Sequence, residues 1–149
     1  MIRVQIGDFD IGREIESLTG GKTSIGGVVS FIGTVRGGGA NGIQSMTLEH
    51  YPGMTEQELT AIEAEANKRW KLEASLIVHR HGKLLPGERI VLVVTAASHR
   101  ADAFAANEFL VDWLKTKAPF WKLEETAQGE RWVEAQASDD NAAKRWVKP

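Results

Sequence analysis

Hydrophobic and polar positions follow two different periods in the first fifty residues, and each period predicts a different element. Alternation over residues 2–6 predicts a strand, whereas apolar positions three to four apart over residues 11–18 predict a short helix that ends at Gly20. Residues 26–35 are almost uncharged and rich in β-branched side chains, which indicates a central strand. Residues 43–51 alternate again, and we expect this strand to pair with the one before it.

A capping signature and two apolar runs predict the next elements. Thr55 begins an S/T-x-x-E sequence typical of a helix N-terminus, and an apolar stripe with helical spacing follows it. Residues 74–78 and 88–97 flank a Leu-Pro-Gly turn and predict a hairpin. Ser98 then offers an N-cap for a helix that Pro119 must end.

The remaining residues complete a pattern of interleaved helices and strands. Residues 120–126 and 131–135 predict a hairpin around Gly129, and residues 142–147 predict a short helix. No linker, repeat or low-complexity tract divides the chain. We therefore expect one domain, residues 1–149, of the α+β class with a mixed, largely antiparallel sheet.

Composition narrows the possible functions. The formal net charge is -2, which argues against a protein that binds nucleic acid or anionic membranes without specificity. The longest apolar run, residues 90–97, is too short to span a bilayer, and the N-terminus lacks the pattern of a secretory signal. We therefore expect a cytoplasmic protein with neither nucleic acid nor membrane as a partner.

The chain contains no cysteine. Disulfides, a thiolate metal site and a cysteine nucleophile are therefore excluded. If the protein performs sulfur chemistry, the sulfur must come from another molecule.

The segment Lys115–Glu124 is the strongest candidate for a site. It combines three lysines with Phe120 and Trp121 around the helix-ending Pro119. Two partly desolvated amines near one another lower each other's pKa, so that one of them can act as a nucleophile or base. The alternative is that Lys115 and Lys122 extend from an amphipathic edge into solvent, where the first would also interact with the helix dipole.

A second group of cations could hold an anion. Ser98, His99 and Arg100 follow a buried strand at the start of a helix, where backbone N–H groups also favour phosphate or carboxylate. Arg36 ends another strand and is a candidate third contact. The Gly37–Gly42 loop beside it is either a hairpin connector or a flap that orders around a ligand.

His79 and His81 lie two positions apart on a predicted strand, a spacing that can bind a metal. No third ligand of suitable type is evident nearby, and His-x-His alone is unspecific. We therefore predict no metal site.

Several segments, in order and spacing, resemble one known family. They are FIGTVRG (31–37), LEHYPGM (48–54), HRHG (79–82), SHR (98–100), KTKAPFWKLE (115–124) and RWVEA (131–135) followed by AAKRW (142–146). Together they are similar to the catalytic large subunit of molybdopterin synthase over nearly the whole chain.

The resemblance implies an α/β-hammerhead fold with an additional small β subdomain and no cofactor of its own. It also implies a homodimer at the centre of a heterotetramer. A small ubiquitin-like sulfur-carrier subunit would insert a C-terminal Gly-Gly tail bearing a thiocarboxylate. The enzyme would be a sulfurtransferase that converts cyclic pyranopterin monophosphate into molybdopterin, so the sulfur would belong to the partner.

The resemblance also implies site residues. Catalytic and substrate-binding positions carried over from the family are Lys115, Lys122, Thr34, Val35, Arg36, His99, Arg100, Leu123 and Glu124. Our hypothesis makes Lys122 the general acid/base at the pterin and places Lys115 against the thiocarboxylate. Arg36, His99 and Arg100 would hold the substrate phosphate.

At two positions the residue differs from the one found in some relatives. Thr34 stands where some relatives have lysine, and Gln136 where we expect some to have arginine, which predicts a less basic pocket.

Two other functions are compatible with the candidate residues. One is a non-catalytic dimeric module that binds an anionic metabolite through Arg36, His99 and Arg100. The other is an enzyme that forms a Schiff base on one of its lysines.

Overall fold

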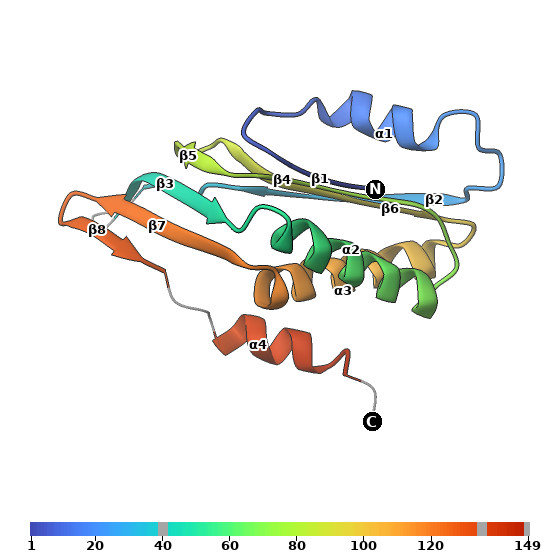
Figure 1. Cartoon of the computed structure of the whole chain (residues 1–149). Helices are drawn as coiled ribbons and strands as arrows, with labels where there is room; N and C mark the ends of the chain where they lie inside the picture. Colours follow the sequence, from blue (N-terminus) through green and yellow to red (C-terminus); the bar gives the residue numbers. More distant parts are fainter. Residues whose placement is uncertain (39–41, 134–136, 148–149) are drawn as a thin grey trace.

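A computed structural model of the chain describes residues 1–38, 42–133 and 137–147, in which two sheets interleave with helices (Figure 1). The strands are β1 (Ile2–Gln5), β2 (Gly27–Thr34), β3 (Ile43–His50), β4 (Leu72–Arg80), β5 (Gly82–Leu84), β6 (Arg89–Ala97), β7 (Phe120–Thr126) and β8 (Gly129–Trp132). The helices are α1 (Ile11–Thr19), α2 (Met54–Arg69), α3 (Arg100–Lys117) and α4 (Ala137–Lys144). The predicted α+β class is confirmed.

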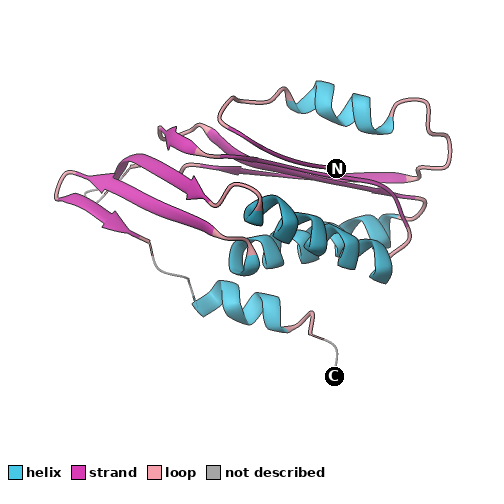
Figure 2. Cartoon of the chain, viewed as in Figure 1, coloured by secondary structure: helices cyan, strands magenta, loops and turns pink. Residues whose placement is uncertain are grey.

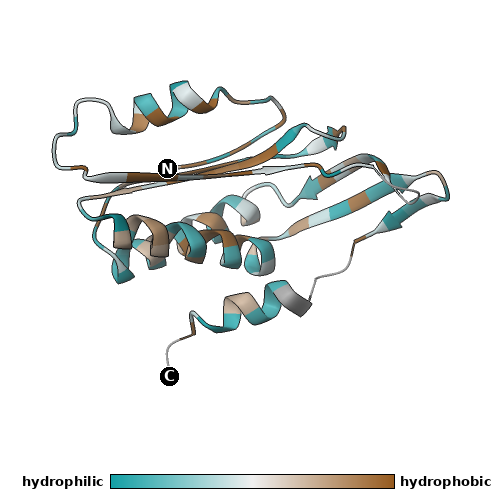
Figure 3. Cartoon of the chain, turned by 180° about the vertical axis from the view of Figure 1, so that it is seen from behind, coloured by the Kyte–Doolittle hydropathy of each residue, from teal (hydrophilic) through white to brown (hydrophobic). Residues whose placement is uncertain are grey.

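The first sheet has the strand order β1-β4-β6-β2, with β1 and β4 parallel and the other pairs antiparallel. Helix α1 covers one face, and α2 and α3 cover the other (Figure 2). Both faces of β6 are therefore buried: Val91 and Val93 pack with α2 and α3, whereas Leu92 and Val94 pack beneath α1. Brown, hydrophobic colouring accordingly follows the central strands (Figure 3).

The second sheet has the order β5-β3-β7-β8 and is antiparallel throughout. The expectation that β3 pairs with β2 was wrong, because β3 pairs with β5 and β7, and β2 pairs with β6. The inward residues of β3, Met46 and Leu48, form a small core cluster with Val35 and Leu84, and Ile90 of β6 packs against it. The glycine-rich segment thus joins strands of different sheets, and its residues 39–41 lie outside the described part of the chain.

Two predicted N-caps were wrong. Helix α2 begins one residue before Thr55, with Gly53 as N-cap at φ 86°, and the Glu56 carboxylate accepts the Gly53 N–H. Helix α3 begins after His99, and the Ser98 hydroxyl instead donates to Glu73 at 3.2 Å. In both cases the hydroxyl that the local sequence predicted to cap the helix bonds to a group outside the helix instead.

The C-terminal elements agree in part with the prediction. The β7–β8 hairpin is confirmed, but β8 begins at Gly129, directly after the turn and with φ 113°, two residues before the predicted start at 131. Helix α4 begins before the predicted residues 142–147, and its polar sequence gave no hydrophobic period. Tertiary bonds hold this end of the chain: Asp112 accepts Arg145 Nη2 at 2.8 Å and Trp146 Nε1 at 2.7 Å.

Within the described residues, no helix is both long and apolar enough to cross a membrane. Residues 134–136, which include Gln136, lie outside those residues, so the predicted effect of that position remains an expectation.

Candidate active site

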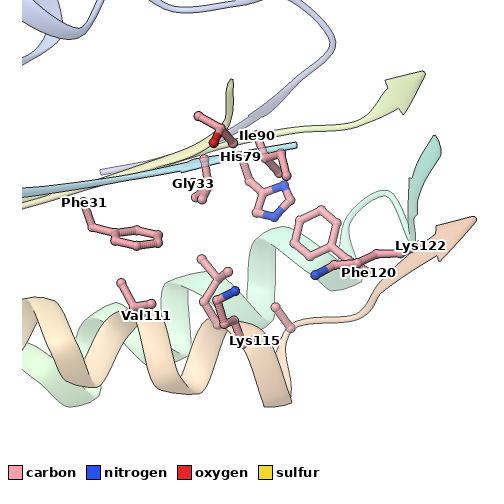
Figure 4. Close-up of a pocket in the computed structure, with 12 residues that line it drawn as sticks. Phe31, Gly33, His79, Ile90, Val111, Lys115, Phe120 and Lys122 are labelled. Carbon is pink, nitrogen blue, oxygen red and sulfur yellow. The ribbon is translucent and has the colours of Figure 1, made fainter. Parts of the chain in front are cut away.

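Lys115 and Lys122 face one cavity from two different elements (Figure 4). Lys115 lies in the last turn of α3, and Lys122 is the third residue of β7. The turn at Pro119 brings them together, because the Phe120 N–H donates to Ala118 O at 2.9 Å and reverses the chain. The structure therefore brings together the two lysines that the sequence singled out.

The walls of this cavity are largely apolar. Phe31 and Gly33 come from β2, Val111 and Leu114 from α3, and Phe120 from β7. A Cβ on Gly33 would lie 2.8 Å from Val91 Cγ1, so only glycine lets β2 pass this close. The space that these walls enclose is about 610 Å³, a volume that includes space open to solvent.

The environment of Lys122 lowers the pKa of its amine. Burial lowers the pKa of Lys122 below its ordinary value, and the positive charge of Lys115 lowers it further. The carboxylates of Asp139 and Glu124 act in the opposite direction without cancelling the effect. An amine whose pKa is lowered in this way can release a proton and accept it again at the site.

Glu124 is buried on the same face of β7 as Lys122, as the two-residue period predicted. Its ion pair in the described part of the chain is with Arg131, whose Nη2 lies 3.4 Å from Oε1. The adjoining cleft is also lined by Asp139 of α4. Sequence reasoning missed both Arg131 and Asp139. Arg131 pairs with Glu124 across the β7–β8 hairpin, which requires the exact register of the two strands, whereas only tertiary packing brings α4 to this place.

The other predicted positions on β2 and β7 divide by strand alternation. Thr34 and Arg36 line the cleft beside the lysines. Val35 lies between them and turns into the small core, where it is 2% exposed. Leu123 lies between Lys122 and Glu124, so its side chain turns to the opposite face of β7.

His99 and Arg100 lie far from the lysines of the same chain. They stand at the first turn of α3, whereas Lys115 stands at the last. Fifteen residues of helix separate Arg100 from Lys115, about 22 Å at the usual helical rise. One chain therefore does not join these two residues and the two lysines in a single pocket.

His79, which the sequence offered only as a weak metal ligand, lines the cavity. Its ring stacks on Phe120 with the centroids 3.7 Å apart. The ring of His81 instead lies 4.2 Å from that of His50. In the part of the chain that the structure describes, no three His, Cys, Asp or Glu residues are grouped to hold a metal.

Comparison with known proteins identifies the family. The family model described as MoaE protein matches residues 4–117. The molybdopterin synthase catalytic subunit of Ralstonia nicotianae is 55% identical over 146 residues, which cover 97% of this chain and 83% of that protein.

Solved structures agree with that match. The molybdopterin biosynthesis MoaE protein from Burkholderia ambifaria MC40-6 has a TM-score of 0.83 and 52% identity, covering 98% of this chain and 97% of its own. Molybdopterin synthase from Staphylococcus aureus has a TM-score of 0.82 and 30% identity, covering 89% and 96%. The chain therefore belongs to the MoaE protein family.

Proposed function

We propose that this protein is the catalytic subunit of a molybdopterin synthase that works in the cytoplasm. It transfers sulfur from the thiocarboxylated C-terminus of a small ubiquitin-like subunit to cyclic pyranopterin monophosphate. The observation that carries the proposal is the convergence of Lys115 and Lys122 on one apolar-walled cavity in a chain of this family. Since the chain has no cysteine, the sulfur comes from the partner's tail.

Each transfer forms a carbon–sulfur bond at a side-chain carbon of the pterin and breaks the carbon–oxygen bond at that carbon, whose oxygen leaves as water or stays on the phosphate. Water replaces the partner's carbon–sulfur bond with a carbon–oxygen bond, so the spent tail leaves as a carboxylate. Lys122, whose pKa is lowered, moves the proton at the pterin. Lys115 is more exposed at the mouth of the cavity, where its ammonium group compensates the negative thiocarboxylate.

The same arrangement supports a dimer. Arg36 lies in the cleft beside the lysines and is the local contact for the substrate phosphate. His99 and Arg100 can join it only from a second copy of the chain, because α3 separates them from the lysines of their own chain. We therefore assign the phosphate site to Arg36 with His99 and Arg100 of a second copy, within a homodimer that carries two small subunits.

Four further predicted residues support this site. Thr34 and Glu124 line the cleft and orient the substrate and Lys122, respectively. Val35 and Leu123 point away from the cleft and support the two segments that carry the site residues.

The test is to mix Lys122→Ala protein with thiocarboxylated partner and cyclic pyranopterin monophosphate, and to measure molybdopterin by mass spectrometry. We expect the rate to fall by about 100-fold or more, the usual contribution of a general acid/base. Lys117→Ala is the matched control, because the Lys117 amine lies over the Trp113 ring, 4.9 Å from its centroid. An undiminished rate in Lys122→Ala would contradict the role assigned to Lys122, whereas wild-type protein that forms no molybdopterin would favour the non-catalytic anion-binding module.

A further inference from the structure

The two nitrogens of the His79 imidazole have different environments. Nδ1 lies 2.7 Å from the carbonyl oxygen of Arg80. A carbonyl only accepts hydrogen bonds, so Nδ1 carries the proton and Nε2 carries a lone pair. In the described residues Nε2 has no hydrogen-bond partner, although His79 is only 3% exposed and lines the cavity.

The imidazole is also held in one protonation state and one position. Burial, reinforced by the charge of Lys122, lowers the pKa of His79 to about 3. The ring lies nearly parallel to Phe120, with 16° between the planes. His79 is therefore a fixed, neutral hydrogen-bond acceptor near neutral pH, and too weak a base to carry a proton during catalysis.

This acceptor complements the rest of the cavity. Lys115 and Lys122 supply donors, which suit the acceptor and anionic atoms of a ligand. Figure 4 shows the two amines turned toward the space below the His79 and Phe120 rings. A ligand that satisfies all three side chains must present an N–H edge to His79 as well as acceptors to the lysines, and a flat heterocycle with ring N–H groups does so.

We propose that Nε2 of His79 accepts a hydrogen bond from an N–H group of the pterin ring system and so fixes the orientation of the ring between Lys115 and Lys122. The inference rests on the proposed function, because it takes the substrate to be a pterin. It makes His79 a substrate-orienting residue that neither exchanges protons nor binds metal.

The experiment measures the Kd of cyclic pyranopterin monophosphate by calorimetry on the purified protein. His79→Phe keeps a flat ring against Phe120 but removes the acceptor. We expect the Kd to rise by about three- to tenfold, as for one neutral hydrogen bond. His79→Gln, whose amide oxygen restores an acceptor, should bind more tightly than the Phe variant. His81→Phe is the control, since that ring lies outside the cavity against His50, and its Kd should not change.

Two further readouts separate orientation from a structural role. The affinity for the small subunit and the pH dependence of the rate should stay as in the wild type. A pterin methylated at its ring N–H groups should bind the wild-type protein more weakly, which tests the bond even if a variant does not fold. An unchanged Kd in His79→Phe, equal affinity for the methylated pterin, or a displaced pH profile would overturn the proposal.

The outcomes also separate this proposal from the proposed function. Wild-type protein that binds the pterin but forms no molybdopterin with thiocarboxylated partner contradicts the proposed function, while the Kd values still decide the role of His79. Wild-type protein that does not bind the pterin contradicts the role of His79.

Discussion

The hydroxyl of Thr55 on α2 donates a hydrogen bond to the carbonyl oxygen of Pro119, 3.3 Å away, in the turn between the two lysines. The Thr55 hydroxyl oxygen in turn accepts the N–H of Tyr51 at 3.1 Å, and Thr55 is fully buried. One side chain therefore ties the start of α2 to the turn that positions Lys115 and Lys122. This contact explains why a threonine that is not an N-cap is nevertheless enclosed in the fold.

Thr55→Val should destabilise the fold, because it leaves two partly buried backbone groups, Tyr51 N–H and Pro119 O, without their partner. We expect a loss of about 1–3 kcal/mol in the free energy of unfolding, measured by urea denaturation. Thr60→Val is the control: Thr60 is exposed on the same helix and bonds only to Glu56 O. Equal losses of unfolding free energy in the two variants would show that the hydrogen bond to Pro119 adds nothing to stability.

The pKa of Lys122 should respond in opposite directions to changes at its two neighbours. Lys115→Met removes a positive charge and should raise the pKa of Lys122. Asp139→Asn removes a negative charge and should lower it further. Titration by NMR with ¹³C at the lysine Cε measures both shifts. No shift in either variant would mean that burial alone controls the pKa of the amine, and shifts of the same sign would contradict the electrostatic explanation.

His79 should make the protein sensitive to acid. Its pKa is about 3 in the folded protein and near 6.5 when unfolded, so the unfolded chain binds more protons between these values. The free energy of unfolding is therefore unaffected by this titration above about pH 6.5. Below that pH it declines toward pH 3, by up to about 1.4 kcal/mol per pH unit. The free energy of unfolding, measured with urea from pH 4 to pH 7, should change less with pH in His79→Phe than in the wild type. Identical pH dependences in the two proteins would exclude the effect.

Asp112 should control how firmly α4 is held against α3. Asp112→Ala removes the acceptor of both Arg145 and the Trp146 indole N–H. Because Asp139 of α4 lines the cleft, we expect faster amide exchange in α4 and a lower rate of sulfur transfer. Glu108→Ala, which removes only an exposed contact to Arg145, should change exchange far less.

Much of the site could be anticipated wherever short-range chemistry decides the geometry. Lys115 and Lys122 are separated by one proline turn, so their convergence follows from where the helix must end and the strand begins. The alternation of Lys122, Leu123 and Glu124 across β7 was likewise readable, because side chains in a strand change face at every residue.

Long-range packing decided the rest. His79 enters the site only because the stacked ring of Phe120, which is distant in sequence, brings β7 to the end of β4. The partners of β3 depend on which cluster buries Met46 and Leu48, and alternation alone does not specify a partner strand.

The sequence by itself determined most helices and strands, the α+β class, the absence of a cysteine and the two lysines of the site, because each depends on local periodicity, a turn or composition. Only the tertiary structure decided the pairing of β3, the distance of His99 and Arg100 from the lysines, and the place of His79 in the cavity. These depend on contacts between segments far apart in the chain, whose free energy is not visible in any local pattern.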